Sequence, residues 1–134
     1  MENNVILIDI EKMMLTAQGP MNLKIQTTIQ TGELVALFGQ SGAGKTTFLK
    51  ILAGLLTPDK GLIRFGHTVW FDSGQQINLA PQKRNVSLMF QDYALFPNMT
   101  VEQNIRFAQP DKNHALATEL LSTLGLTELR KRKP

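Results

Sequence analysis

Apolar and polar residues alternate in the first quarter of the chain. In residues 21–29 the apolar side chains occupy odd-numbered positions: Met21, Leu23, Ile25 and Ile29. This period is typical of a half-buried β-strand. Residues 5–10 predict an earlier strand, and residues 62–65 and 68–71 predict a short hairpin pair. The pattern therefore predicts an antiparallel β subdomain.

A different pattern follows in residues 34–38, which read Leu-Val-Ala-Leu-Phe without alternation. Such a run is typical of a strand covered on both faces, as in a parallel sheet. A helix is predicted over 45–52, where Gly54 can close it. The apolar residues expected on one side of this helix are Phe48, Leu49, Ile51 and Leu52. A further buried strand is predicted over 86–90.

The last third of the chain predicts two more helices. Thr100 and Gln103 have the spacing of a capping box, which starts a helix. Residues 113–124 predict a final helix that ends at Gly125. The predicted fold class is α/β: a P-loop NTPase core with an incomplete parallel sheet, beside an antiparallel β subdomain.

Composition narrows the class of protein. The 134 residues are 43% apolar and 19% charged, which is typical of one soluble globular domain. Cysteine is absent, which excludes a disulfide framework and a thiolate zinc site and agrees with a reducing compartment. The apolar runs are far shorter than the roughly 20 residues that span a bilayer, and the N-terminus lacks a signal-peptide pattern. We expect a cytoplasmic protein.

The net charge of +3 does not by itself indicate nucleic-acid binding. Basic residues gather at 130–133, but no aromatic residue interleaves with them. This run is therefore interpreted as a solvated charged end, with a basic nucleic-acid-binding module as an alternative.

The candidate chemistry lies in residues 39–46, which read Gly-Gln-Ser-Gly-Ala-Gly-Lys-Thr and match the phosphate-binding loop pattern. The glycines allow successive N–H groups to approach phosphate oxygens, and the following helix directs its positive end at the same anion. Lys45 is expected to bridge the β- and γ-phosphates, and the Thr46 hydroxyl to bind Mg²⁺. The predicted nucleotide-binding residues are Gly39, Ser41, Gly42, Ala43, Gly44, Lys45, Thr46 and Thr47. The alternative is a glycine-rich turn with a surface lysine.

Residues 41–47, 52–61 and 88–97 together resemble the ATP-binding subunit of an ABC transporter, over nearly the whole chain. The resemblance implies ATP and Mg²⁺ as cofactors and Lys45 and Gln91 as catalytic residues. In this family the glutamine corresponding to Gln91 contacts Mg²⁺ and the attacking water. Residues 69–84 are similar to importers of oxyanions, above all of molybdate.

The same resemblance implies partners and a location. Two ATP-binding subunits would form a dimer beneath transmembrane permease subunits, on the inner face of the cell membrane. The apolar loop residues Leu95, Phe96 and Met99 are then expected to receive a coupling helix of the permease. The alternative is that Phe96 and Met99 pack into the chain's own core.

The chain also departs from the family pattern. It has no Leu-Ser-Gly-Gly-Gln signature loop, no second apolar strand that ends in Asp-Glu, and no late histidine, since His67 and His114 are interpreted as surface residues. We therefore expect residues 1–134 to be the N-terminal part of a nucleotide-binding domain that ends before the signature motif. Hydrolysis coupled to transport is implied for the family, but these hydrolytic motifs are missing.

Two further points stay open. Residues 13–17 contain no aromatic side chain to stack on adenine. The alternatives to a transporter subunit are a phosphate-loop protein outside transport, such as a small-molecule kinase, and an incomplete chain with no activity of its own. A central strand without its neighbour would also expose an apolar edge that favours aggregation.

Overall fold

The computed structural model describes residues 5–90, 94–107, 109 and 114–134. The chain divides into two compact units, Met1–Leu88 and Met89–Pro134. Each unit has its own secondary structure, and each is therefore described by itself.

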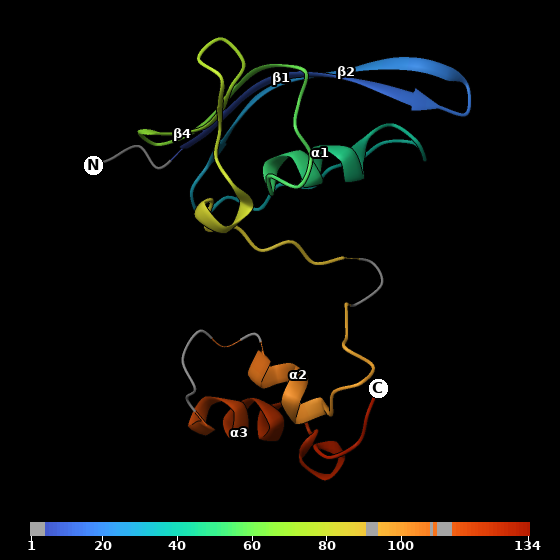
Figure 1. Ribbon diagram of the computed structural model, residues 1–134, viewed down its shortest axis with the longest axis vertical. Helices are drawn as coiled ribbons and strands as arrows, with labels where there is room; N and C mark the ends of the chain where they lie inside the picture. The colour runs from blue at the N-terminus through green and yellow to red at the C-terminus, as the bar shows by residue number, and fades with distance from the viewer. Residues whose placement is uncertain (1–4, 91–93, 108, 110–113) are drawn as a thin grey trace. The chain divides into compact units, whose positions relative to one another are not determined.

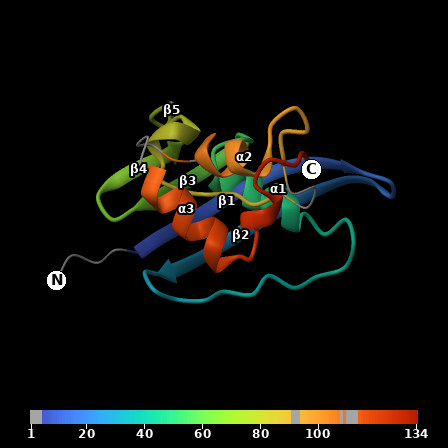
Figure 2. The same cartoon turned by 90° about the horizontal axis from the view of Figure 1, so that it is seen from below.

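The first unit contains a five-stranded antiparallel sheet in the order β2-β1-β3-β4-β5. Its strands are β1 Val5–Thr16, β2 Gly19–Gln30, β3 Lys60–Phe65, β4 Thr68–Asp72 and β5 Ile77–Asn78. The first two strands form a long hairpin in which Ile10 lies opposite Ile25, and β3 pairs with the other edge of β1 (Figure 2). The antiparallel subdomain predicted from the alternating pattern is thus confirmed, while the short strand β5 was not predicted.

Helix α1, Lys45–Leu52, lies against one face of this sheet (Figure 1). The core between them is formed by Ile8, Ile10, Phe48, Ile51, Ile63, Trp70 and Phe71. The bounds of the helix agree with the prediction, and Gly54 follows it with φ +78° and donates to the Ile51 carbonyl at 3.0 Å. Leu49, which was expected on the buried side, is 44% exposed instead, because the helix buries a stripe centred on Phe48 and Ile51.

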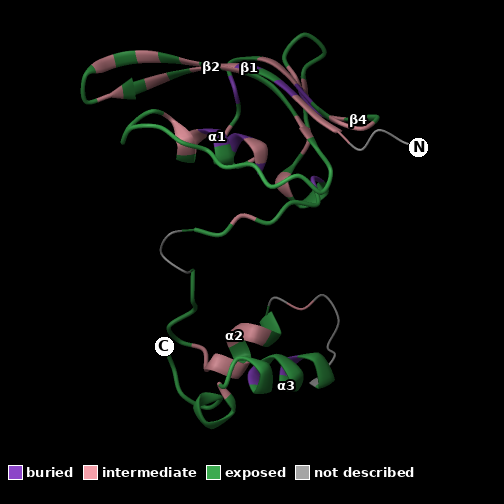
Figure 3. Cartoon of the chain, turned by 180° about the vertical axis from the view of Figure 1, so that it is seen from behind, coloured by how far each residue is buried: buried purple, intermediate pink, exposed green. Residues whose placement is uncertain are grey.

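The two strands predicted over 34–38 and 86–90 are absent from the described structure, where both segments are irregular. This part of the prediction is wrong. A central strand needs backbone partners on its edges and cover on its faces, and every strand pair of the described residues is antiparallel and lies within β1 to β5. Figure 3 shows the consequence, since the segment that leads into α1 is exposed along residues 31–43.

The second unit contains α2 Val101–Phe107, α3 His114–Thr123 and the short 3₁₀ helix η2 Thr127–Leu129. The predicted capping box is present: Thr100 N–H donates to Gln103 Oε1 at 2.8 Å, and Gln103 N–H donates to Thr100 Oγ1 at 3.2 Å. Gly125 follows α3 with φ +66°, as predicted for a helix end.

The basic run at 130–133 is tied to α2 through its backbone. Val101 N–H donates to the Arg132 carbonyl at 2.8 Å, and Glu102 N–H donates to the Arg130 carbonyl at 3.0 Å. The run is exposed, in agreement with a solvated end. Among the described residues, no helix is both long and apolar enough to cross a membrane.

Candidate phosphate-binding site

The glycine-rich loop ends at α1, and two of its glycines have backbone conformations that favour glycine. Gly42 has φ +83° and Gly44 has φ +91°, in the left-handed region that a side chain disfavours. A Cβ on Gly44 would also lie 3.1 Å from side-chain carbons of Leu23 and Met14. Glycine at position 44 is therefore favoured by its φ angle, and the close approach of the β1–β2 hairpin leaves little room for a side chain.

The N-terminal end of α1 presents backbone donors without acceptors in the helix. Phe48 N–H donates to the Gly44 carbonyl at 2.8 Å, so the N–H groups of Lys45, Thr46 and Thr47 precede the first intrahelical bond. The first turn contains no acidic residue. These donors and the positive end of the helix dipole favour an anion at this position.

The Lys45 side chain folds back over the loop. Its Nζ donates to the carbonyl oxygens of Gly39 at 2.6 Å and Gln40 at 2.7 Å. An ammonium group has three donors, so two are engaged by the loop. The cation thus lies beside the backbone of Gly39 and Gln40, at the start of the loop.

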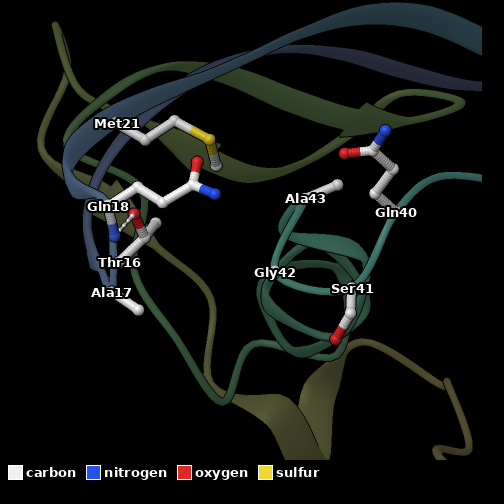
Figure 4. Close-up of a pocket in the computed structure, with 8 residues that line it drawn as sticks. All are labelled: Thr16, Ala17, Gln18, Met21, Gln40, Ser41, Gly42 and Ala43. Atoms are coloured by element: carbon white, nitrogen blue, oxygen red, sulfur yellow. Dashed lines mark hydrogen bonds between the residues drawn. The ribbon is translucent and has the colours of Figure 1, made fainter.

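An open pocket of about 270 Å³ lies between the loop and the end of the β1–β2 hairpin (Figure 4). One wall consists of Thr16, Ala17, Gln18 and Met21. The other wall consists of Gln40, Ser41, Gly42 and Ala43. Among the described residues, no charged side chain lines the pocket. The hairpin wall presents the Met21 thioether, the Ala17 methyl group, the Gln18 amide and the Thr16 hydroxyl. The hydroxyl accepts from Gln18 N–H at 3.2 Å.

The structure places the eight predicted nucleotide-binding residues in one continuous loop and first helical turn. Gln91, predicted to act with Lys45 and Thr46, lies outside the described residues. Among the residues that the structure does describe, no group of three or more His, Asp and Glu side chains could hold a metal ion.

Two features of the first unit were missed from the sequence. The hairpin residues that line the pocket lie far from the loop in sequence, and no local pattern predicts their contact with it. Arg84 is 2% exposed and binds backbone oxygens of three separate segments. The sequence shows only an arginine in a basic stretch, so its burial had no signal.

The apolar loop before α2 packs within its own unit. Phe96 is 38% exposed, and its ring contacts that of Phe107 at a centroid distance of 4.5 Å. The Asn104 side chain accepts from Phe96 N–H at 2.8 Å and donates to the carbonyls of Phe96, Met99 and Thr100. Leu95 is 55% exposed. Phe96 thus has a ring contact within its own unit but remains exposed, Met99 is half-buried and Leu95 is exposed. His67 is exposed, as expected.

The chain is similar in sequence to ATP-binding proteins of known families. It is 40% identical over 116 residues to a molybdenum import ATP-binding protein of Vibrio parahaemolyticus. The aligned region covers 87% of this chain and 32% of that protein. The chain spans about a third of the length of the curated relatives it matches.

Two solved structures share the fold. A dimeric bacterial ABC transporter cassette matches with a TM-score of 0.69 at 20% identity, over 97% of this chain and 61% of that chain. A dimeric post-hydrolysis cassette bound to ADP and Pi matches with a TM-score of 0.66 at 23% identity, over the same shares of both chains. These matches confirm the α/β cassette fold class.

The sequence model of the ABC transporter family matches residues 23–134, which include the loop, α1 and all of the second unit. This match covers most of the chain, and it agrees with the glycine-rich loop and with the fold. The chain belongs to the ABC transporter family.

Proposed function

We propose that the chain binds ATP with Mg²⁺ at residues 39–47 and forms part of the ATP-binding subunit of an importer of molybdate or a similar oxyanion. The observation that carries the proposal is the loop itself, in which left-handed glycines, the N-terminal N–H groups of α1 and the Lys45 ammonium converge. The relatives named as molybdenum import proteins supply the substrate class.

Each loop residue has a role in this proposal. The N–H groups of residues 42–47 would hold phosphate oxygens, although that of Ala43 would first have to leave the Gln40 carbonyl, to which it donates at 3.2 Å. The third donor of Lys45 would bind the β- and γ-phosphates. The exposed Thr46 hydroxyl would bind Mg²⁺, with Gln91 as a second ligand that also orients water. Thr47 would bind on the α-phosphate side. Bound Mg²⁺ would neutralise phosphate charge.

The pocket beside the loop would receive the nucleoside. It begins at Ser41 and Gly42 and continues to the hairpin wall (Figure 4). The base would then rest on Met21 and the aliphatic part of Thr16, with the Gln18 amide near its polar edge. This arrangement supplies dispersion contacts without the ring stacking that an aromatic residue provides.

The test is calorimetric titration of the purified chain with Mg·ATP. Lys45→Ala should weaken binding by roughly 1.5–3 kcal/mol, the scale of a hydrogen bond to a charged group. Lys50→Ala is the matched control, because Lys50 is an exposed lysine in the last turn of the same helix. Equal affinities of the parent and Lys45→Ala would reject the site.

The partners belong to the same proposal. Two ATP-binding subunits would face each other beneath transmembrane permease subunits, at the inner face of the membrane. The exposed Leu95 is the residue of the 95–99 loop best placed for a permease helix, because Phe96 already packs on Phe107.

Leu95 gives a test of this docking in the full-length subunit. Leu95→Asp should reduce co-purification with the permease and leave nucleotide affinity unchanged, since a charge cannot be buried in an apolar contact without cost. Glu128→Asp is a control on the exposed surface of the same unit. Normal assembly and transport by Leu95→Asp would remove the loop from the interface.

A further inference from the structure

Among the described residues of the first unit, Arg84 is the buried charge, with 2% of its surface exposed. All its guanidinium donors reach oxygen atoms: Leu79 O at 2.9 Å, Ile51 O at 2.9 Å, Leu52 O at 3.2 Å, Trp70 O at 3.4 Å and Asn78 Oδ1 at 3.0 Å. None of the ion pairs among the described residues includes it. The charge is therefore held by backbone carbonyls and one amide.

Burying a cation is costly unless its donors are satisfied, so this arrangement requires the acceptors to stay in place. Two of them, Ile51 O and Leu52 O, are at the C-terminal end of α1, where helix carbonyls lack intrahelical donors and a cation is favourable. The planar fork of an arginine can bind them and the strand carbonyls at the same time.

Gly54 makes this approach possible. A Cβ on Gly54 would lie 2.8 Å from Arg84 Nε and 2.9 Å from Cζ. The residue that closes α1 must therefore be small, for a reason separate from its φ of +78°. The guanidinium also lies over the Trp70 ring at 5.9 Å, which joins the helix end to β4.

The opposite end of α1 begins at Lys45 and follows the phosphate-binding loop. A helix of eight residues is only about 12 Å long, and Phe48 and Ile51 are its buried side chains. Leu52 and Leu56 are partly buried against the same core, and because such apolar contacts are non-directional, they oppose rotation and sliding of the helix less than hydrogen bonds do. Arg84 opposes both, because it holds the last carbonyls of the helix to β4 and to the residues of and after β5.

We propose that Arg84 is a positioning residue for the phosphate loop: by fixing the C-terminal end of α1 to the sheet, it fixes where Gly44 and Lys45 lie at the other end. Its effect on nucleotide binding rests on the function proposed above. Its effect on the motion of α1 does not require a nucleotide.

The test compares Arg84→Lys with Ile63→Val in the whole chain. Lysine keeps the charge but cannot serve five acceptors from one plane. Ile63→Val loosens the sheet core without removing any hydrogen bond of Arg84. Fluorescence of Trp70, the single tryptophan of the chain and 3% exposed, reports the thermal unfolding of this unit. Each variant is then studied at a temperature that lies the same number of degrees below its own unfolding midpoint.

Hydrogen exchange of residues 48–50, whose N–H groups are bonded within α1 from Phe48 onward, is the first readout, measured without nucleotide. Arg84→Lys should exchange there roughly tenfold faster than Ile63→Val, while calorimetry should give a Kd for Mg·ATP about tenfold weaker, the size of a typical coupling between sites. Equal exchange in the two variants overturns the proposal. If Arg84 only contributed to stability, the two variants would exchange equally once they are compared at the same distance from their midpoints.

The outcomes separate the two proposals. If the parent chain binds no Mg·ATP, the proposed function fails, and the exchange of residues 48–50 alone decides the role of Arg84. If Arg84→Lys does not fold, Asn78→Asp takes its place, because it keeps an acceptor for Arg84 but removes the amide that donates to Thr57, and Asn78→Ala, which removes both, is compared with it. Asn78→Ala should then raise exchange at 48–50 above that of Asn78→Asp, and equal exchange in the two would overturn the proposal.

Discussion

Two apolar regions of the first unit differ in how far they are buried. The sheet and α1 bury their apolar side chains, and Ile63 at the centre is 0% exposed. Leu34, in the apolar run before the phosphate loop, is 98% exposed, and Phe38 is 90% exposed. Both regions are similarly hydrophobic in sequence, so hydrophobicity alone does not decide which residues become core.

The difference lies in where each segment finds its backbone partners. Strands β1 and β2 are joined by the turn at residues 17–18 and pair over their whole length, and β3 and β4 are joined by a turn of the same kind. A parallel strand needs a partner that is distant in sequence, joined by a crossover. Residues 34–38 have no such partner among the described strands, and their side chains stay exposed as a result.

The largest expected effect comes from truncating the buried region. Ile63→Ala should lower the free energy of unfolding of the first unit by roughly 2–5 kcal/mol, through lost transfer energy and the cavity left behind. Urea unfolding followed by Trp70 fluorescence measures it.

Leu34→Ala is the matched control, because leucine and isoleucine have the same number of carbon atoms. Its effect should be about 0.5 kcal/mol or less, as for an exposed substitution. Similar losses in both variants would mean that residues 34–38 are packed in solution, and the contrast between the two regions would be lost.

A smaller effect is expected from an ion pair at the edge of the sheet. Asp59 accepts from Lys12 Nζ at 2.6 Å and from Met13 N–H at 2.7 Å. The hydrogen bond from Lys12, then that from Met13, lowers the pKa of Asp59 below its ordinary value of 3.8. A carboxyl group with a depressed pKa stabilises the fold above the unfolded value, and this contribution disappears as the pH falls through the folded pKa.

Asp59→Asn should therefore be less stable than the parent near neutral pH, and the gap should close below pH 3.8. Urea unfolding of Asp59→Asn and the parent, near neutral pH and below pH 3.8, measures the difference in the free energy of unfolding. This difference should be smaller than that caused by Ile63→Ala, because the carboxyl group is partly exposed. A gap that is constant with pH would show that the charge contributes nothing.

Local patterns predicted much of this fold. The alternation of residues 21–29 predicted a strand and its half-buried face, and the spacing of Thr100 and Gln103 predicted the start of α2, because these signals depend on neighbours along the chain. Long-range contacts decided the rest. The apolar run at 34–38 has a strand pattern but lacks a strand partner in the described residues.

The site divides in the same way. The phosphate loop is a local motif, so its residues and their order were available from sequence. The pocket wall at Thr16 and Met21 depends on how the hairpin folds over Gly44, and the burial of Arg84 depends on carbonyls up to 33 positions away. No pattern within a short window contains that information.

The most direct measurement is hydrogen exchange of the whole chain with and without Mg·ATP. The account predicts slower exchange at residues 41–48, where the loop and the first turn of α1 would hold phosphate, and no change at 34–38 or at the basic run 130–133. Unchanged exchange at 41–48, or protection confined to 130–133, would contradict a nucleotide site at the loop and indicate charge binding by the basic end instead.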